Sequence, residues 1–141
     1  MRKYFLTILL ISLSFSITYS QNIKYHNLSA EIFYTKINLY NNNLLLDVRT
    51  FAEYRKSRIA NSVYAGDKNE LIRITKSLDK NNPILVYCSN GERSLTVCNI
   101  LTSELNFKNV YNLKYGLLEW QNIGYVLDKT KIKKNYFFNK K

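Results

Sequence analysis

The sequence predicts an α/β domain of three layers, in which a central parallel sheet of about five strands has helices on both faces. Short apolar runs alternate along the chain with segments in which apolar residues recur at helical spacing. The chain has 141 residues, which suffices for one well-formed core, and no internal repeat or linker divides it. Because parallel strands must be joined by crossovers that helices usually supply, this alternation favours a parallel sheet.

Residues 1–20 predict a secretory signal peptide. Arg2 and Lys3 form a basic start, and the apolar stretch that follows ends near Ser16, which is too short for a comfortable membrane span. Small residues near the end of the segment fit cleavage after Ser20. We therefore expect a periplasmic or secreted protein without stable membrane insertion after cleavage, and the alternative is an uncleaved anchor.

The rest of the chain divides into a folded domain over residues 21–127 and a basic tail over residues 128–141, which we expect to be solvated. The formal net charge of the whole chain is +11. Lysine, asparagine, isoleucine and tyrosine are enriched together, so the charge reflects a general composition rather than a patch selected for phosphate contacts. No nucleic-acid motif accompanies the charge, and we expect no nucleic-acid partner.

The first helix is expected to begin after Ser29, a suitable N-cap residue. Ile32, Phe33 and Ile37 have the spacing of one apolar helix face. Three consecutive asparagines at residues 41–43 favour a turn rather than a helix. The sequence therefore predicts an amphipathic helix that ends just before these asparagines and packs one face on the sheet.

Two strands and two helices are expected in the next part of the chain. Residues 44–48 are apolar except for Asp47 and predict a buried strand. Residues 51–56 predict a short helix, and residues 62–64 a brief strand. Asp67 suits the N-cap of the following helix, and the Asn-Asn-Pro sequence at residues 81–83 ends it. The apolar positions of that helix are Leu71, Ile74 and Leu78.

A further strand, helix, strand and helix complete the predicted domain. The apolar residues 84–88 form a strand, and the helix after it extends to about Leu105. Asn106 marks a turn, and residues 110–113 form the next strand. The apolar residues of the final helix are Leu117, Leu118 and Trp120, of which the tryptophan is expected in the core.

The most informative feature is Cys88, which ends an apolar strand and enters a short polar turn that opens a helix near Glu92. This position places the sulfur at the carboxyl edge of the sheet, where open α/β folds bind ligands. Gly91 allows a tight turn, so that backbone N–H groups from Ser89 to Ser94 can point at the sulfur or at an anion beside it. These groups and the helix N-terminus would lower the thiol pKa, which predicts a reactive thiolate.

The alternative is that Cys88 is a small buried core residue, as most free cysteines are. A core cysteine needs neither the glycine nor the polar residues of the turn, which favours the reactive interpretation. Cys98 falls among apolar residues of the next helix and is assigned to the core, so no disulfide with Cys88 is expected. The single histidine, His26, and the absence of metal-ligand spacing predict no metal site.

Three blocks of the sequence match the signatures of one family. They are Leu46–Thr50 with Glu53-Tyr54, then Cys88–Ser94, and then Asn109–Leu113 with Gly116 and Trp120. Together they resemble the early aspartate-arginine signature, the active-site loop and the closing block of single-domain rhodanese-like sulfurtransferases of the exported type. The resemblance covers nearly all of the expected mature chain and implies a rhodanese-like three-layer fold over residues 21–127.

The resemblance also implies a reaction. The Cys88 thiolate would take a sulfane sulfur from thiosulfate or a persulfide donor, hold it as a persulfide, and pass it to a thiol or cyanide. The expected partners are a small anionic sulfur donor and a thiol acceptor, and no cofactor is needed because backbone N–H groups stabilise the anions. The residues expected to bind the donor and the persulfide are Ser89, Asn90, Gly91, Glu92, Arg93 and Ser94.

Three further residues are assigned supporting roles, namely Asp47, Arg49 and Arg58. Arg93 has two interpretations, an anion clamp on the donor or a buried structural partner of Asp47, and the resemblance favours the second. Arg49 and Arg58 are candidates for drawing an anion to the rim, although a surface or ion-paired arginine explains each more readily. The chain departs from the family at residues 57–62, where glycines are usual, which bears on substrate choice more than on fold.

Two other functions remain open at this stage. One is a non-catalytic rhodanese-fold module that binds or regulates another protein, and the other is a persulfide carrier that hardly uses thiosulfate. The intact Cys88 and its loop favour the enzyme, because a binding module has no chemical need for either. Related cysteine phosphatases have one residue more between the cysteine and the arginine than the four found here, so phosphatase activity is not expected.

Overall fold

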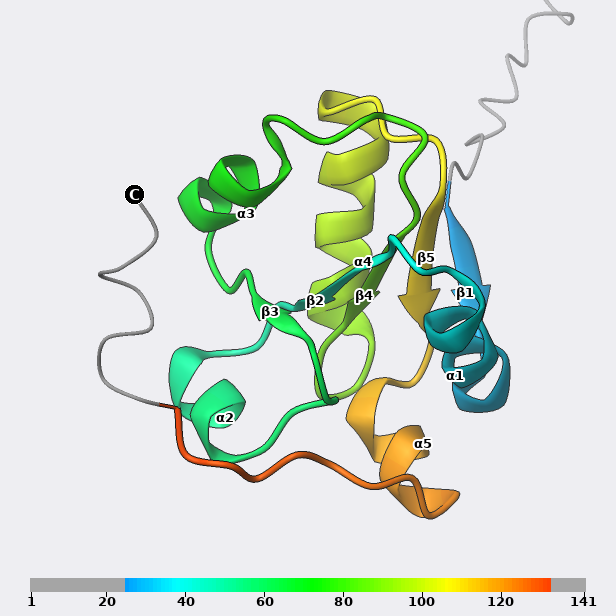
Figure 1. Ribbon diagram of the computed structural model, residues 1–141, viewed down its shortest axis with the longest axis vertical. Coiled ribbons are helices and arrows are strands. Elements are labelled where there is room, and N and C mark those ends of the chain that lie inside the picture. Colours follow the sequence, from blue (N-terminus) through cyan, green and yellow to red (C-terminus); the bar gives the residue numbers. More distant parts are fainter. Residues whose placement is uncertain (1–24, 133–141) are drawn as a thin grey trace, which may run out of the picture.

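The computed structural model describes residues 25–132 and contains one five-stranded sheet (Figure 1). Its strand order is β1-β5-β4-β2-β3, and every pair of neighbouring strands is parallel. The strands are β1 His26–Leu28, β2 Leu44–Asp47, β3 Val63–Tyr64, β4 Ile84–Tyr87 and β5 Val110–Leu113. The predicted α/β class with a five-stranded parallel sheet is therefore confirmed. The predicted signal peptide lies outside the described residues.

Helices connect the strands and follow the last one. They are α1 Ala30–Leu39, α2 Phe51–Lys56, α3 Lys68–Thr75, α4 Glu92–Asn99, the π-helical segment η1 Ile100–Glu104, and α5 Gly116–Asn122. The bounds of α2 and of β5 are those predicted from the sequence. Asp67 caps α3 as predicted, because its side chain accepts a hydrogen bond from the backbone N–H of Glu70 at 2.9 Å.

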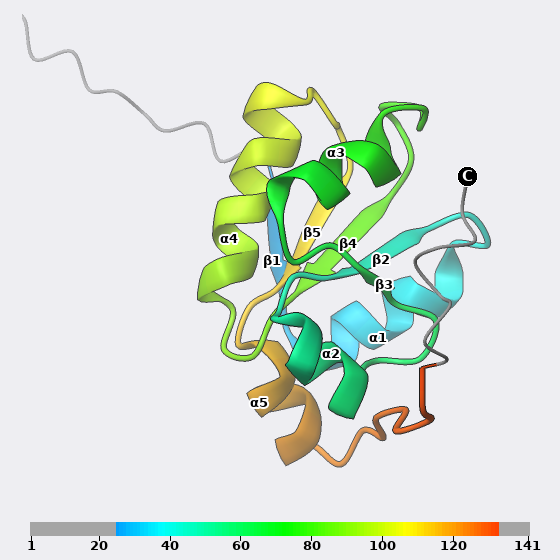
Figure 2. The same cartoon turned by 90° about the vertical axis from the view of Figure 1, so that its left-hand side faces the viewer.

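Successive strand residues point to opposite faces of the sheet and build two cores, one on each face. Figure 2 shows α3 and α4 on one side of the sheet and α1, α2 and α5 on the other. The core on the α3 and α4 side consists of Leu46, Val48, Ala65, Leu71, Ile84, Val86, Cys88, Cys98, Leu101, Phe107 and Val110. The core on the α1 and α5 side consists of Ala30, Phe33, Leu45, Ile59, Leu85, Tyr87, Tyr111, Leu113, Leu117 and Trp120.

The central strand β4 determines where the chemistry lies. All four of its residues are buried, because the sheet is covered on both faces. Since the strands are parallel, the segments that follow them meet at the carboxyl edge of the sheet. Cys88 comes directly after β4, Val48 directly after β2, and Gly116 a short turn after β5. The fold thus brings three sequence-distant segments together around the cysteine.

The sequence does not locate β1, the strand at the far edge of the sheet. Leu28 is its single apolar residue, so the segment has no strand-like hydrophobic pattern. It forms by pairing with β5, where His26 lies opposite Tyr111 and Leu28 opposite Leu113. The strand is therefore specified by its neighbour rather than by its own composition.

The predicted apolar face of α1 is wrong at one position. Phe33 is completely buried, but Ile32 is 52% exposed to solvent. Ser29 is the N-cap residue as predicted, although its side chain makes no capping hydrogen bond. The backbone N–H of Ala30 instead donates to the Glu119 carboxylate at 3.2 Å. A residue of α5 thus accepts a hydrogen bond from one of the free backbone N–H groups at the start of α1.

The helix after the Cys88 loop ends close to the predicted residue, but its last turn widens. In η1 the backbone N–H of Leu105 donates to Ile100 at 3.0 Å, which is the i to i−5 pattern of a π-helix. Asn106 then adopts a φ of 60° and reverses the chain, as predicted for a turn. In the final helix, Trp120 is buried but Leu118 is 59% exposed, so that part of its predicted apolar set faces outward.

The body of the protein includes the start of the segment predicted as a tail. Arg58 and Asp128 exchange backbone hydrogen bonds of 3.0 and 2.8 Å, and their side chains form an ion pair of 2.6 Å. The Arg58 guanidinium also donates to Thr130. These contacts attach the chain past residue 127, where the predicted domain ended. Within residues 25–132, no helix has the length and apolar character to cross a lipid bilayer.

Candidate active site

Cys88 has no exposed surface, and its sulfur is surrounded by polar groups of the loop that follows it. The backbone N–H of Gly91 donates to Sγ at 3.2 Å, and the Ser94 hydroxyl lies 3.4 Å from it. The Ser94 hydroxyl also donates to the carbonyl of Gly91 at 2.9 Å, which fixes its position. The predicted arrangement, in which loop donors converge on the sulfur, is therefore present.

The environment of Cys88 favours the thiolate. Burial by itself would raise the thiol pKa, but hydrogen bonds from the Ser94 hydroxyl and from the N–H groups of Ser94, Asn90 and Gly91 outweigh it, and the net effect lowers the pKa of Cys88. The start of α4 at Glu92 adds the positive end of a helix dipole. These are the conditions under which a cysteine becomes a nucleophile at neutral pH.

Two glycines allow the loop to close around the sulfur. Gly91 has a φ of 94°, and a Cβ atom there would collide with the carbonyl oxygen of Lys114. Gly116, at the start of α5, packs against the peptide backbone that follows Cys88, where a Cβ atom would lie 2.5 Å from the Cys88 carbonyl oxygen. The loop backbone and the start of α5 are thus in direct contact.

This contact orients the peptide groups of the loop. The N–H of Leu117 donates to the carbonyl of Cys88 at 2.9 Å, and the N–H of Leu118 donates to the carbonyl of Ser89 at 3.1 Å. Because α5 binds the carbonyl groups of Cys88 and Ser89, the peptide groups at the start of the loop have a fixed orientation. The N–H of Gly91, further along the loop, then points at the sulfur. The closing block of the sequence therefore contributes to the site through its backbone.

The predicted pairing of Arg93 with Asp47 is wrong. The Arg93 guanidinium forms a two-pronged ion pair with Glu53, with both N–O distances 3.1 Å, and also donates to the Ser89 hydroxyl at 3.0 Å. Its side chain is 43% exposed, so it is not a buried structural arginine. The sequence could not distinguish the two arginines near Asp47, because both occupy signature positions and only their position in space differs.

Asp47 pairs with Arg49 instead. The two side chains are 2.6 Å apart at their closest atoms and are almost completely buried. Arg49 also donates to the carbonyl of Ser57 at 2.5 Å, so the pair joins the end of β2 to the segment after α2. Arg49 is therefore an ion-paired arginine, as the sequence favours. It is buried and does not lie at the rim of the Cys88 site, where it could draw in an anion.

The remaining predicted residues are placed as follows. Arg58 is buried and bound to Asp128, so it serves the attachment of the C-terminal segment. Asn90 and Glu92 are exposed, and the Asn90 side-chain oxygen accepts from the Glu92 N–H at 3.3 Å and lies 3.9 Å from the Cys88 sulfur. Cys98 is buried on the same face of the sheet as Cys88, both thiols are free, and burial raises the pKa of Cys98 well above its ordinary value.

Glu53 is the residue of the site that the sequence interpretation missed. Its carboxylate accepts hydrogen bonds from the Thr50 backbone N–H at 2.9 Å, the Thr50 hydroxyl at 2.6 Å and the Ser89 hydroxyl at 2.8 Å, in addition to Arg93. The hydrogen bond from Arg93 is the largest of the effects that hold its pKa well below the ordinary value. The signal was the pattern Thr50-x-x-Glu53, a capping box that would have fixed the start of α2.

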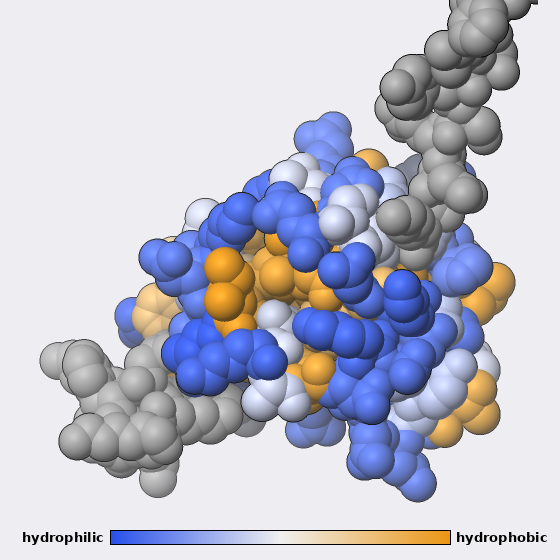
Figure 3. Space-filling view, turned by 90° about the horizontal axis from the view of Figure 1, so that it is seen from above, coloured by the Kyte–Doolittle hydropathy of each residue, from blue (hydrophilic) through white to orange (hydrophobic). Residues whose placement is uncertain are grey.

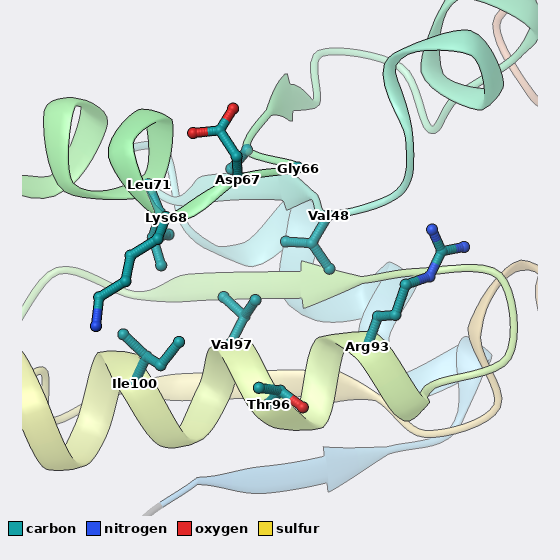
Figure 4. A pocket seen from close by; sticks show the side chains of 10 residues that line it. Val48, Gly66, Asp67, Lys68, Leu71, Arg93, Thr96, Val97 and Ile100 are labelled. Atoms are coloured by element: carbon teal, nitrogen blue, oxygen red, sulfur yellow. The ribbon is translucent and has the colours of Figure 1, made fainter.

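A pocket of about 240 Å³ adjoins the site between α3 and α4. Figure 4 shows Arg93 at one end of it and Lys68 toward the other, with the side chains of Leu71, Val97 and Ile100 along its length. Figure 3 shows apolar surface in a hollow that hydrophilic residues surround. Arg93 therefore belongs both to the Cys88 loop and to the wall of this pocket. Among the described residues, no cluster of His, Cys, Asp and Glu has the arrangement of a metal site.

Comparison with known proteins identifies relatives of this chain. The family model described as rhodanese-like domain matches residues 29–123. The thiosulfate sulfurtransferase GlpE of Coxiella burnetii is 35% identical over 78 residues, which are 55% of this chain and 71% of the relative. The putative sulfur carrier protein YrkF of Bacillus subtilis is 29% identical over 93 residues, which are 66% of this chain and 49% of the relative.

Solved structures share the fold. A rhodanese-like domain from Anabaena sp. has a TM-score of 0.62 at 24% sequence identity, with 74% of this chain and 79% of that chain covered. A rhodanese-related protein from Thermoplasma volcanium has a TM-score of 0.58 at 26% identity, with 75% of this chain and all of that chain covered. These similarities agree with the α/β fold of the described residues.

Proposed function

This chain belongs to the rhodanese-like domain family, and we propose that it is a sulfurtransferase that works through a persulfide on Cys88. The observation that carries the proposal is the set of hydrogen-bond donors around Sγ, led by the Gly91 N–H at 3.2 Å and the Ser94 hydroxyl at 3.4 Å. A buried core cysteine has no use for these donors, whereas a thiolate or a persulfide anion is stabilised by them.

In the first half of the reaction, the Cys88 thiolate attacks the outer sulfur of thiosulfate. A new S–S bond forms to Cys88, and the S–S bond of thiosulfate breaks with its electron pair leaving on sulfite. One thiolate and one thiosulfate dianion thus give one persulfide anion and one sulfite dianion. A low-molecular-weight persulfide can donate in the same way, with a thiolate as the leaving group.

In the second half, a thiolate or cyanide attacks the outer sulfur of the persulfide. The bond to Cys88 breaks, its electron pair returns to the Cys88 thiolate, and the product is a new persulfide or thiocyanate. Each anionic state of Cys88 is held by the same N–H groups, so the cycle needs no cofactor. The expected partners are therefore a small anionic sulfur donor and a thiol acceptor, without a nucleic acid.

A second candidate is a persulfide carrier that accepts sulfur from a partner protein and hardly uses thiosulfate. The similarity to the putative sulfur carrier protein YrkF favours it, although this chain spans about half the length of that relative. The two candidates share the Cys88 persulfide and differ in the donor. Rapid loading by a persulfide together with slow loading by thiosulfate identifies the carrier.

We also propose that the protein acts in the periplasm or after secretion. The support is the basic start and the short apolar stretch within residues 1–20, which have the pattern of a cleavable signal. Expression in a bacterium with two membranes, followed by mass analysis of the periplasmic protein, tests this. A mass that corresponds to a chain beginning at Gln21 is the expected result.

The reaction is tested by the intact mass of the reduced protein before and after thiosulfate. We expect a gain of about 32 Da, one sulfur atom, which cyanide removes and which Cys88→Ser abolishes. The matched variant Cys98→Ser leaves the gain in place, because Cys98 is completely buried and its burial raises the thiol pKa. If neither thiosulfate nor a persulfide adds sulfur to reduced Cys88, the chain is a rhodanese-fold binding module instead.

A further inference from the structure

Glu53 connects α2 to both ends of the Cys88 loop. Its carboxylate accepts from the Ser89 hydroxyl at 2.8 Å at the start of the loop and from the two guanidinium nitrogens of Arg93, each at 3.1 Å, at the start of α4. Ser89 and Arg93 also bind each other at 3.0 Å. A carboxylate thus occupies a position at which a cation and a hydroxyl donor converge beside the reactive cysteine.

The donors that Glu53 occupies are those that an oxyanion of a sulfur donor would need. A guanidinium binds a planar pair of oxygens in two-pronged fashion, whether they belong to a carboxylate or to a sulfonate-like group. Arg93 is also close enough to Cys88 for the negative charge of the thiolate to help raise the Arg93 pKa, after the larger effect of Glu53. Since Cys88 has no exposed surface, a donor must displace side chains near the loop before it reaches the sulfur.

We infer that Glu53 acts as an internal competitor for the anion-binding groups of the loop and sets the choice of donor, disfavouring dianions such as thiosulfate relative to persulfides of lower charge. The inference deepens the proposed function and rests on it for the identity of the donor. A dianion must displace the Glu53 carboxylate from Arg93 and then stay close to that carboxylate. The negative charges of the dianion and of Glu53 repel each other, and the single guanidinium of Arg93 must compensate both. A donor of lower charge reaches Cys88 with less repulsion, so Glu53 is a specificity-determining residue.

The inference can be tested without any sulfur transfer, by alkylation of Cys88. Iodoacetate and iodoacetamide have nearly the same shape and attack the same thiolate, but the first carries a carboxylate and the second is neutral. The ratio of their rate constants at Cys88 reports access for an anion, while changes in thiolate content or in loop opening affect both reagents and cancel. We expect Glu53→Gln to raise the ratio by about tenfold, the effect of releasing one charge-assisted contact.

Two further variants make the result specific. Glu70→Gln removes the same charge from the corresponding third residue of the neighbouring helix α3, where Glu70 pairs with Arg73, and it should leave the ratio unchanged. Glu53→Asp keeps the charge but shortens the side chain by one methylene group, so it should raise the ratio because contact with Arg93 is lost. If the ratio of the iodoacetate to the iodoacetamide rate constant in Glu53→Asp equals that of the unmodified protein, the negative charge of residue 53 matters but its contact with Arg93 does not. That result would overturn the inference.

Failure of the inference is distinguishable from failure of the proposed function. Steady-state rates with thiosulfate and with the persulfide of cysteamine, whose ammonium group balances the charge of its persulfide anion, are compared in the same variants, and Glu53→Gln should raise the kcat/KM for thiosulfate relative to that for the persulfide by a similar factor. If the alkylation ratio responds but Cys88 gains no sulfur from either donor, the competitor role stands and the sulfurtransferase proposal fails. If sulfur is transferred and neither ratio responds, the sulfurtransferase proposal stands and the competitor role fails.

Discussion

Cys88 and Cys98 belong to the same core on one face of the sheet, but their thiol pKa values are shifted in opposite directions. Burial is the largest effect at both thiols and raises the pKa of each. At Cys98 nothing reverses that effect, whereas at Cys88 the Ser94 hydroxyl and the loop N–H groups bind the anion and bring the pKa below its ordinary value. The difference in pKa between the two thiols thus comes from a few donors within hydrogen-bond distance of Cys88.

The lowered pKa predicts the pH dependence of Cys88 alkylation. The thiolate predominates above the pKa that Cys88 has in the folded protein, so the rate of alkylation by iodoacetamide should rise with pH. It should reach half of its maximum at a pH below 9.0, the ordinary pKa of a cysteine thiol. Ser94→Ala removes a charge-assisted hydrogen bond and should reduce the rate at pH 7 roughly tenfold, with the half-maximum moved upward. Ser62→Ala, which removes a buried hydroxyl bound to Tyr87, is the control that should leave the profile in place. A half-maximum at or above 9.0 in the unmodified protein would contradict the assignment.

At the scale of elements, the site depends on how closely α5 approaches the loop between β4 and α4. The start of α5 binds the first loop carbonyls, and Gly91 and Gly116 have no side chain at the points of contact. Asn61 illustrates the same requirement elsewhere, because it has a φ of 63° in the segment where the family usually has glycine. Asparagine tolerates that conformation better than most residues, so the fold persists despite the departure.

Gly91→Ala should therefore disrupt the loop. The substitution combines a left-handed backbone with a collision against the Lys114 carbonyl, and we expect it to lower the free energy of unfolding by about 2–4 kcal/mol and to abolish persulfide formation. Gly124→Ala is a matched control, because its φ is 88° but no atom lies within 4 Å of the added Cβ. It should lower the free energy of unfolding by about 1 kcal/mol and retain activity. Urea unfolding and the mass assay measure the two effects, and equal losses of activity in both variants would argue against a role for close packing.

At the scale of the whole molecule, Arg49 and Arg93 differ in their environment: Arg49 is expected to stabilise the fold and Arg93 to bind the sulfur donor. The Asp47–Arg49 pair is buried between the sheet and the segment after α2, whereas the Glu53–Arg93 pair is near the surface. A buried charge that loses its partner is strongly destabilising, while an exposed ion pair contributes little to the free energy of unfolding. The loop can therefore change its charge interactions without unfolding the domain.

Substitution of each arginine by methionine tests this division. Arg49→Met leaves Asp47 buried without its partner and should lower the free energy of unfolding by about 3–5 kcal/mol. Arg93→Met should change it by less than about 1 kcal/mol but should weaken the binding of thiosulfate, seen as a higher KM. Urea unfolding curves and steady-state kinetics measure the two quantities. A larger loss of stability in Arg93→Met than in Arg49→Met would reverse the assignment.

The sequence by itself determined the fold class, most elements and the position of the Cys88 loop. Apolar runs and N-cap residues are local signals, so β2, α2, β4 and β5 could be located from residues close in the chain. The loop from Cys88 to Ser94 is also local, because a glycine and successive backbone N–H groups need no distant partner to form an anion-binding turn. Its family resemblance follows from the same contiguous residues.

Only the tertiary structure decided which side chains pair around that loop. Glu53 is distant in sequence from Arg93, and Asp47 lies near several arginines, so the choice of partners depends on how α2, α4 and the end of β2 are placed relative to one another. The edge strand β1 likewise has no pattern of its own and forms because β5 offers free backbone groups. Long-range packing, rather than local preference, determines the charges beside Cys88, and through them the anions that reach its sulfur.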